Sequence, residues 1–194
     1  MPGPAPDSKG ERTRRRVLDA AAAEIARHGV VGSSLRSIAA AAGLKTGSVY
    51  FHFDSKEHLF EAVLEEGLHR TLEHLDAALS ALPAGAPAVD RLCAALRAHA
   101  VAVNELRAYT VVVLAPDPTA SEIAGDGFRT LRRGYLDRWA ALVADAQREG
   151  SLPAGPDARL TRDLLFGAVN AVGLAGRPPD EITAAVCALL DLRS

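Results

Sequence analysis

The stretch SSLRSIAAAAGLKTGSVYFHFDSKEHLFEAV, residues 33–63, decides how the first third of this 194-residue chain folds. Ser34 precedes residues 35–42, whose apolar side chains repeat at helical spacing, so it is expected to cap a short helix there. Gly43 is expected to end that helix, because glycine tolerates the positive φ of a sharp turn. A second helix can therefore start within a few residues.

That second helix is expected over residues 47–52 with Thr46 as its cap, and Ser55 is expected to cap a long helix beginning at Lys56. Two short helices joined by so tight a turn are typical of a helix-turn-helix, in which the second helix enters the major groove of DNA. The spacing alone is moderately specific for this motif.

The rest of the chain is also predicted to be helical. Alanine dominates a hydrophobic content of 48%, aromatic residues make up 5%, and alanine is the best helix former. No segment alternates apolar and polar residues as a strand does. We predict an all-α protein of about nine helices. They are expected at about 12–28, 34–42, 47–52, 56–82, 88–105, 109–114, 119–149, 157–174 and 180–192.

Charge is distributed unevenly along the chain. Residues 1–56 hold nine Lys and Arg against five Asp and Glu, while the remainder holds thirteen against nineteen. A basic head on an acidic body suggests that only the head meets a polyanion. Four arginines fall within residues 12–16, and they fit either a solvated helix face or non-specific attraction to phosphates. The Pro- and Gly-rich residues 1–11 are expected to form a disordered arm.

Residues 33–63 closely resemble the DNA-binding signature of the tetracycline-repressor (TetR) family. The match covers about a third of the chain. It rests on Ile38-Ala39, Gly43, Gly47, Val49-Tyr50, His52-Phe53 and Ser55-Lys56-Glu57. The resemblance implies a helix-turn-helix domain at 12–56 and a ligand-binding and dimerisation domain at 57–194. It also implies a repressor that a small hydrophobic effector releases from a palindromic operator. An activator, or a relative that binds ligand but no DNA, is the alternative.

By the same resemblance, eight residues are expected to contact DNA. They are Arg36, Lys45, Thr46, Gly47, Ser48, Tyr50, His52 and Lys56. Arg36 suits guanine O6 and N7, because its guanidinium forms a planar fork. Lys56 opens a helix whose amide-rich start favours phosphate. Tyr50 fits a phosphate contact and a place in the core equally well.

The resemblance implies a homodimer through the last two helices, near 157–174 and 180–192. Both carry apolar residues on more than one side, so a second face needs a partner unless both faces enter the chain's own core. The expected interface residues are Leu165, Phe166, Val169, Val172, Val186 and Leu189.

In this family the effector lies inside the second domain. Isolated polar or aromatic residues on apolar helices are therefore candidate ligand contacts, since a pocket needs a few convergent polar groups. The candidates are Tyr109, Tyr135, Trp139 and Asn170. Ligand is expected to act by shifting the population of helix positions, which changes the spacing of the two recognition helices.

Other classes of function lack their motifs. The sequence lacks nucleotide-binding loops, nucleophile elbows and paired metal-ligand histidines. We therefore expect no enzymatic activity, no cofactor and no metal. Cys93 and Cys187 lie far apart without a CxxC pattern, and they are expected to be buried thiols in a reducing compartment. No apolar run is long enough for a membrane span, so a cytoplasmic protein is expected.

Overall fold

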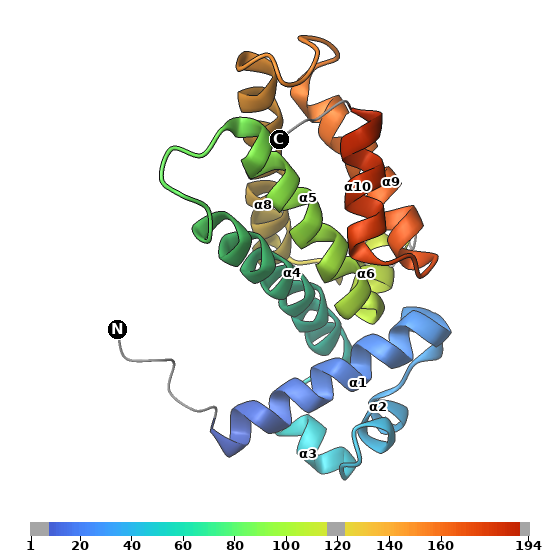
Figure 1. The fold of residues 1–194 in the computed structure, drawn as a ribbon. Coiled ribbons are helices and arrows are strands. Elements are labelled where there is room, and N and C mark those ends of the chain that lie inside the picture. Colours follow the sequence, from blue (N-terminus) through green and yellow to red (C-terminus); the bar gives the residue numbers. More distant parts are fainter. Residues whose placement is uncertain (1–7, 116–122, 191–194) are drawn as a thin grey trace. The chain divides into compact units, whose positions relative to one another are not determined.

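The computed structural model describes residues 8–115 and 123–190, and all regular secondary structure in these two ranges is helical. The predicted all-α class is confirmed. The helices, labelled as in Figure 1, are α1 (Lys9–Gly32), α2 (Leu35–Ala41), α3 (Thr46–Tyr50), α4 (Lys56–Ser80), α5 (Ala88–Glu105), α6 (Arg107–Leu114), α8 (Asp126–Arg148), α9 (Ala158–Leu174) and α10 (Pro179–Leu189).

The described residues form two compact units. The first unit holds residues 8–67, 108–115 and 123–128, and the second unit holds residues 68–107 and 129–190. Helix α4 therefore contributes its first half to one unit and its second half to the other. The division of the chain into functional domains at residue 56 stays a prediction.

Helix α1 begins at Lys9. The expectation of a disordered arm over residues 1–11 is therefore wrong for residues 9–11. The reason is a capping box: the Ser8 hydroxyl accepts from the Glu11 amide, and the Ser8 amide donates to the Glu11 carboxylate. Residues 1–7 of the expected arm lie outside the described residues. Gly29, with φ of 72°, interrupts α1 where the sequence predicted the end of the helix.

The first unit is built on contacts of α2 with α1 and α3. Its core is filled by apolar side chains from α1, α2, α3 and the start of α4. They include Val17, Leu18, Ala21, Ile25, Ile38, Val49, Phe53, Leu59, Phe60 and Val63. Helix α6 joins this unit through Tyr109, whose ring lies against Gly67 of α4. A Cβ at Gly67 would come within 2.9 Å of Tyr109 Cβ, so glycine permits the close approach of the two helices.

The second unit is a helical bundle in which α5 packs against α9 and α10, and these two pack against each other. The contact between α5 and α9 is close at Gly173, where an added Cβ would lie 2.6 Å from Val103 Cγ1. Trp139 of α8 is the largest fully buried side chain of the described chain. The bundle therefore has an aromatic side chain at its centre, and closely packed helices surround it.

Candidate functional site

The turn between α2 and α3 has the predicted geometry. The Ser34 hydroxyl accepts from the Ser37 amide at 3.0 Å and caps α2, as expected. Gly43 adopts φ of 64° and ends it. The prediction that Thr46 caps a helix over 47–52 is wrong by one to two residues. The Lys45 carbonyl already accepts from the Ser48 amide at 2.9 Å, so helical bonding starts earlier and α3 runs from Thr46 to Tyr50.

One side of α3 is anchored in the core and the other is open. Val49 and, just beyond the helix, Phe53 are fully buried. Gly47, Tyr50 and Phe51 follow the i, i+3, i+4 spacing of a single helical face, and all three are exposed. Tyr50 is 54% exposed and Phe51 is 84% exposed. We call Gly47, Tyr50 and Phe51 the outer face of α3.

Phe51 was not among the residues predicted to contact DNA. It lies between Tyr50 and His52, both of which were, and its ring meets the His52 ring edge-on at 5.2 Å between centroids. Its position four residues after Gly47 was the signal in the sequence that could have identified it. An apolar ring so exposed at the end of a recognition helix has no partner in the first unit that covers it.

All eight predicted DNA contacts are accessible at the surface of the first unit. Arg36, Lys45, Gly47 and Tyr50 are exposed, and Thr46, Ser48, His52 and Lys56 are half-buried. Tyr50 is therefore not a core residue. Lys56 Nζ donates to the Val31 carbonyl at 3.4 Å, which is a long contact and leaves the ammonium partly accessible. Their contact with DNA stays a prediction.

Two of the four clustered arginines hold the motif together. Arg16 donates from Nη2 to the Ala42 carbonyl at 2.7 Å, at the end of α2. The Arg14 guanidinium lies 5.3 Å from the centre of the Phe53 ring, in cation–π geometry. These contacts join α1 to the turn between α2 and α3 and to the segment that follows α3.

In the second unit, three of the four candidate ligand residues gather around His99 of α5. The Tyr135 hydroxyl lies 2.9 Å from His99 Nδ1, and Asn170 Oδ1 lies 3.1 Å from His99 Nε2. With the amide oxygen as acceptor, Nε2 carries the proton and Nδ1 accepts from Tyr135. The rings of Phe166 and Trp139 complete the set, at 4.5 and 5.7 Å from the His99 ring. We call these five residues the His99 cluster.

The His99 cluster carries no charge; His99, Tyr135 and Trp139 are buried in it, and Phe166 and Asn170 are half-buried. Burial lowers the pKa of His99 to about 4, and the hydrogen bond that His99 donates to Asn170 offsets this only in part. Burial also raises the pKa of Tyr135 above its usual range. The indole nitrogen of Trp139 lies near Tyr135 but has no acceptor in hydrogen-bonding geometry among the described residues. The cluster thus combines apolar rings with one buried donor that is not satisfied.

Tyr109 does not join this cluster. It belongs to the first unit, where its hydroxyl donates to Asp19 Oδ1 of α1 at 2.8 Å. Helix α6 turns this side chain toward α1 and α4, and its contact with a ligand stays a prediction.

The six candidate interface residues separate into two groups. Leu165, Val169 and Val186 are buried within their own chain, because α9 and α10 turn these residues toward α5. Phe166 is half-buried and stacks on His99. Val172 and Leu189 remain accessible, at 41% and 86% exposure.

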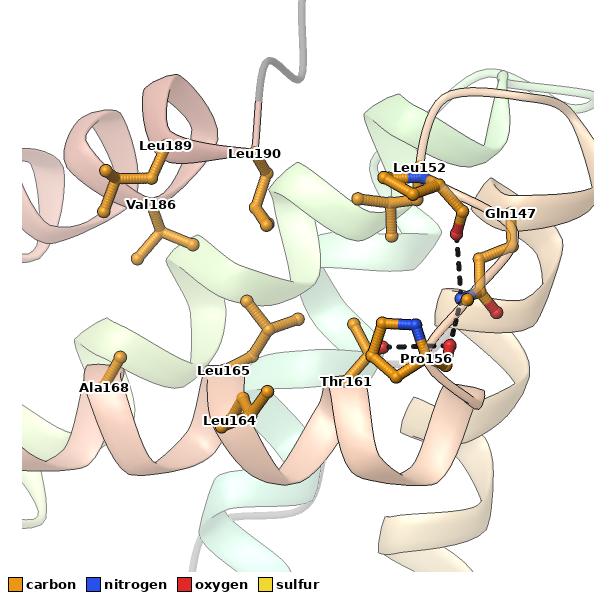
Figure 2. A pocket seen from close by; sticks show the side chains of 12 residues that line it. Gln147, Leu152, Pro156, Thr161, Leu164, Leu165, Ala168, Val186, Leu189 and Leu190 are labelled. Carbon is orange, nitrogen blue, oxygen red and sulfur yellow. Dashed lines mark hydrogen bonds between the residues drawn. The ribbon is translucent and has the colours of Figure 1, made fainter.

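The accessible apolar side chains of α9 and α10 form a different set. These residues, which we call the outer ridge, are Leu160, Leu164, Val172 and Leu189. A groove of about 250 Å³ adjoins the ridge and is almost entirely apolar (Figure 2). It is lined by Leu164, Leu165 and Ala168 of α9, Val186, Leu189 and Leu190 at α10, and the loop before α9. Gln147 steadies that loop by donating to the carbonyls of Pro153 and Pro156.

The described parts of the chain contain neither of two further kinds of site. No helix there has both the length and the apolar character to cross a membrane. No group of three or more His, Cys, Asp or Glu side chains there is arranged to hold a metal ion.

Comparison with known proteins points in one direction. Residues 17–63 match the model of bacterial regulatory proteins of the tetR family, and residues 85–174 match that of the tetracyclin repressor-like C-terminal domain. The chain is 23% identical to the fatty acid metabolism regulator protein of Bacillus subtilis over 155 residues, which cover 79% of this chain and 78% of that protein.

Two other relatives are informative. The HTH-type transcriptional repressor KstR2 of Rhodococcus jostii is 45% identical over 64 residues, which cover 32% of this chain and only 31% of that protein. The crystal structure of AibR in complex with isovaleryl coenzyme A and operator DNA superposes with a TM-score of 0.76 at 21% identity. It covers 92% of this chain and 97% of that one, and it shows a shared fold.

The buried His99 generates a prediction about pH. The unfolded chain takes up a proton at this residue near pH 6.5, whereas the folded chain stays neutral until about pH 4. His99 should therefore cost about 3 kcal/mol of unfolding free energy as the pH falls from 6.5 to 4. Chemical denaturation at several pH values measures this, with His99→Gln expected to remove that part of the pH dependence.

The control is His69→Gln, on the exposed side of α4. Its pH profile should run parallel to that of the unaltered chain. A parallel profile for His99→Gln as well would contradict a buried, neutral His99.

Proposed function

Since the chain belongs to the TetR family of bacterial regulatory proteins, we propose that it is a cytoplasmic, dimeric repressor that binds a palindromic operator and leaves it when an acyl-bearing effector binds. The observation that carries this proposal is the outer face of α3. It is accessible on a helix whose opposite side is anchored by Val49. A regulator needs such a face to reach base edges.

The outer face of α3 is aromatic and bears no charge. Phe51 and Tyr50 present apolar edges, and Gly47 leaves open space beside them. Apolar side chains recognise the 5-methyl group of thymine in the major groove, whereas guanine is read by a fork of donors. We assign thymine contacts to Phe51 and a guanine contact to Arg36. Lys45, which directly precedes α3, and Lys56, which begins α4, suit phosphates, which fix position but not sequence.

This division of roles predicts different losses for different substitutions. Arg36→Ala and Phe51→Ala should each reduce discrimination at one or two base pairs per half-site by about 1–3 kcal/mol. Lys56→Ala should weaken binding to all duplexes alike. It should also reduce the number of ions released on binding, as read from the salt dependence of the affinity, by about one. The measurement is a titration of duplexes selected from random sequence, and of their point variants, at several salt concentrations.

Arg177→Ala, an exposed arginine of the second unit, is the charge-matched control and should change neither quantity. If no duplex bound better than random sequence, the repressor function itself would be excluded.

The outer ridge supports a second copy of this chain as its partner. Leu189 is 86% exposed and Leu164 is 62% exposed, and burying one such leucine contributes about 1.5–3 kcal/mol. The apolar groove beside the ridge offers a recess for side chains from the other copy. A two-fold dimer through α9 and α10 presents two α3 helices to successive major grooves.

We predict that Leu164→Glu and Leu189→Glu each raise the dimer dissociation constant at least tenfold, because each places a carboxylate in an apolar contact. Sedimentation velocity over a range of concentrations measures it. Val31→Glu, in the first unit, is the matched control, since Val31 is an equally accessible apolar residue at 80% exposure. Dimers of unchanged stability in both leucine variants would show that the copies pair through another surface.

The His99 cluster supports an acyl thioester of coenzyme A as effector. Its rings suit an acyl chain, and a thioester carbonyl would give Trp139 Nε1 the acceptor that it lacks. Arg132 is exposed and lies three residues before Tyr135 on α8, within reach of an anionic headgroup. AibR, of the same fold, was solved with isovaleryl coenzyme A.

This proposal predicts that an acyl-CoA of suitable chain length raises the melting temperature and releases the operator, while coenzyme A alone does neither. Trp139→Phe keeps an aromatic side chain, though a smaller one, and removes the donor, so it should weaken acyl-CoA binding about five- to tenfold. Arg177→Ala, at an exposed side chain outside the His99 cluster and the outer ridge, is the control for loss of a second-unit side chain. Equal responses to free fatty acid and acyl-CoA would exclude the thioester.

A further inference from the structure

The two cysteines of the chain lie side by side. Cys93 is on α5 and Cys187 is on α10, and their Sγ atoms are 3.2 Å apart. Both side chains are half-buried, and both thiols are free. The sequence predicted two unrelated buried thiols, because 94 positions separate them and no motif connects them.

The helices that carry these cysteines are in direct contact along the bundle. The two sulfurs are therefore held at close range by packing rather than by chance encounter. A disulfide needs a sulfur separation of about 2.05 Å, so rotation of two short side chains suffices to close the gap. Because the chain has only these two cysteines, no third thiol competes within the molecule.

We propose that Cys93 and Cys187 form a reversible disulfide when the protein meets a hydroperoxide. The Cys187 sulfur attacks the terminal oxygen of the hydroperoxide, the O–O bond breaks, and an alcohol leaves, so Cys187 becomes a sulfenic acid. The Cys93 sulfur then attacks Cys187 Sγ, the S–O bond breaks, and water leaves with the Cys93 proton. Two thiols are oxidised, and one hydroperoxide is reduced to alcohol and water.

The environment of Cys93 assigns it the second step. Burial, together with the neighbouring Cys187 and then Asp90, raises the pKa of Cys93 to about 12. The thiolate is the reactive form of cysteine, so Cys93 is a poor first nucleophile for a peroxide in solution. Held against Cys187, it needs only to attack a sulfur already in contact. The pair therefore responds to sustained oxidant, in keeping with the transient disulfides of reducing compartments.

The bond would fasten α10 to α5. Helix α10 ends at Leu189, a residue of the outer ridge, next to the last described residue. Linking α10 to α5 would therefore restrain the surface that we assign to the contact with the second copy. The cross-link also closes a loop of nearly half the chain, which restricts the unfolded state. Oxidised protein should therefore be more resistant to unfolding than reduced protein.

The test treats the purified full-length chain with hydrogen peroxide and follows thiol content, peptide mass and melting temperature. We expect both thiols to disappear together, a peptide linking Cys93 to Cys187, and a melting temperature higher by roughly 5–15 °C. A small dithiol should reverse all three. Separate loss of the two thiols, or disulfides only between chains, would overturn the proposal.

Two variants separate the steps. Cys93→Ser should leave a sulfenic acid on Cys187 that a dimedone probe traps, whereas Cys187→Ser should leave Cys93 largely unmodified. Far-ultraviolet circular dichroism establishes that each variant keeps its helices before treatment. Equal dimedone labelling of the two variants would contradict the assigned order, and the peptide map of the unaltered chain decides on the bond itself.

Discussion

Burial of Val49 and Phe53 beneath α3 is the contact on which the DNA-binding surface depends. A helix of five residues is not stable on its own in water. The entropy lost in forming the first turn outweighs the hydrogen bonds that so short a helix gains. These two side chains attach it to the core of the first unit, and Arg14 and Arg16 attach the same region to α1. Because one side of α3 is packed into the core, the residues on its other side can serve recognition without contributing to the packing. That is how Phe51 can be 84% exposed without loss of the fold.

The second unit follows the same logic on a larger scale. Helix α9 sends Leu165 and Val169 into the chain's own core, and it leaves Leu164 and Val172 outside. One sequence of apolar residues thus supplies both an interior and an exposed ridge. The interior also contains a polar chain, from Tyr135 through His99 to Asn170, that apolar packing alone would not require. Buried polar groups that are satisfied in this way specify a single arrangement of side chains, and Trp139 is the exception that points to a ligand.

Local features of the fold could be predicted from the sequence, and contacts between distant segments could not. Ser34 and Gly43 act within a few residues of themselves, so their roles follow from spacing. Which residues of α9 face outward could not be predicted from spacing. Apolar side chains surround this helix, and only the packing of its neighbours determines which of them are covered. The Tyr109–Asp19 contact and the Cys93–Cys187 pair were missed for the same reason. Both depend on helix packing across many tens of residues.

We propose that two copies of this chain place two outer faces of α3 in successive major grooves of one duplex. Hydroxyl-radical footprinting of the dimer on its selected operator tests it most directly. The account predicts two protected windows on one side of the duplex, with centres separated by one helical turn of about 34 Å or a multiple of it. A single window, or protection spread evenly along the duplex, would contradict it.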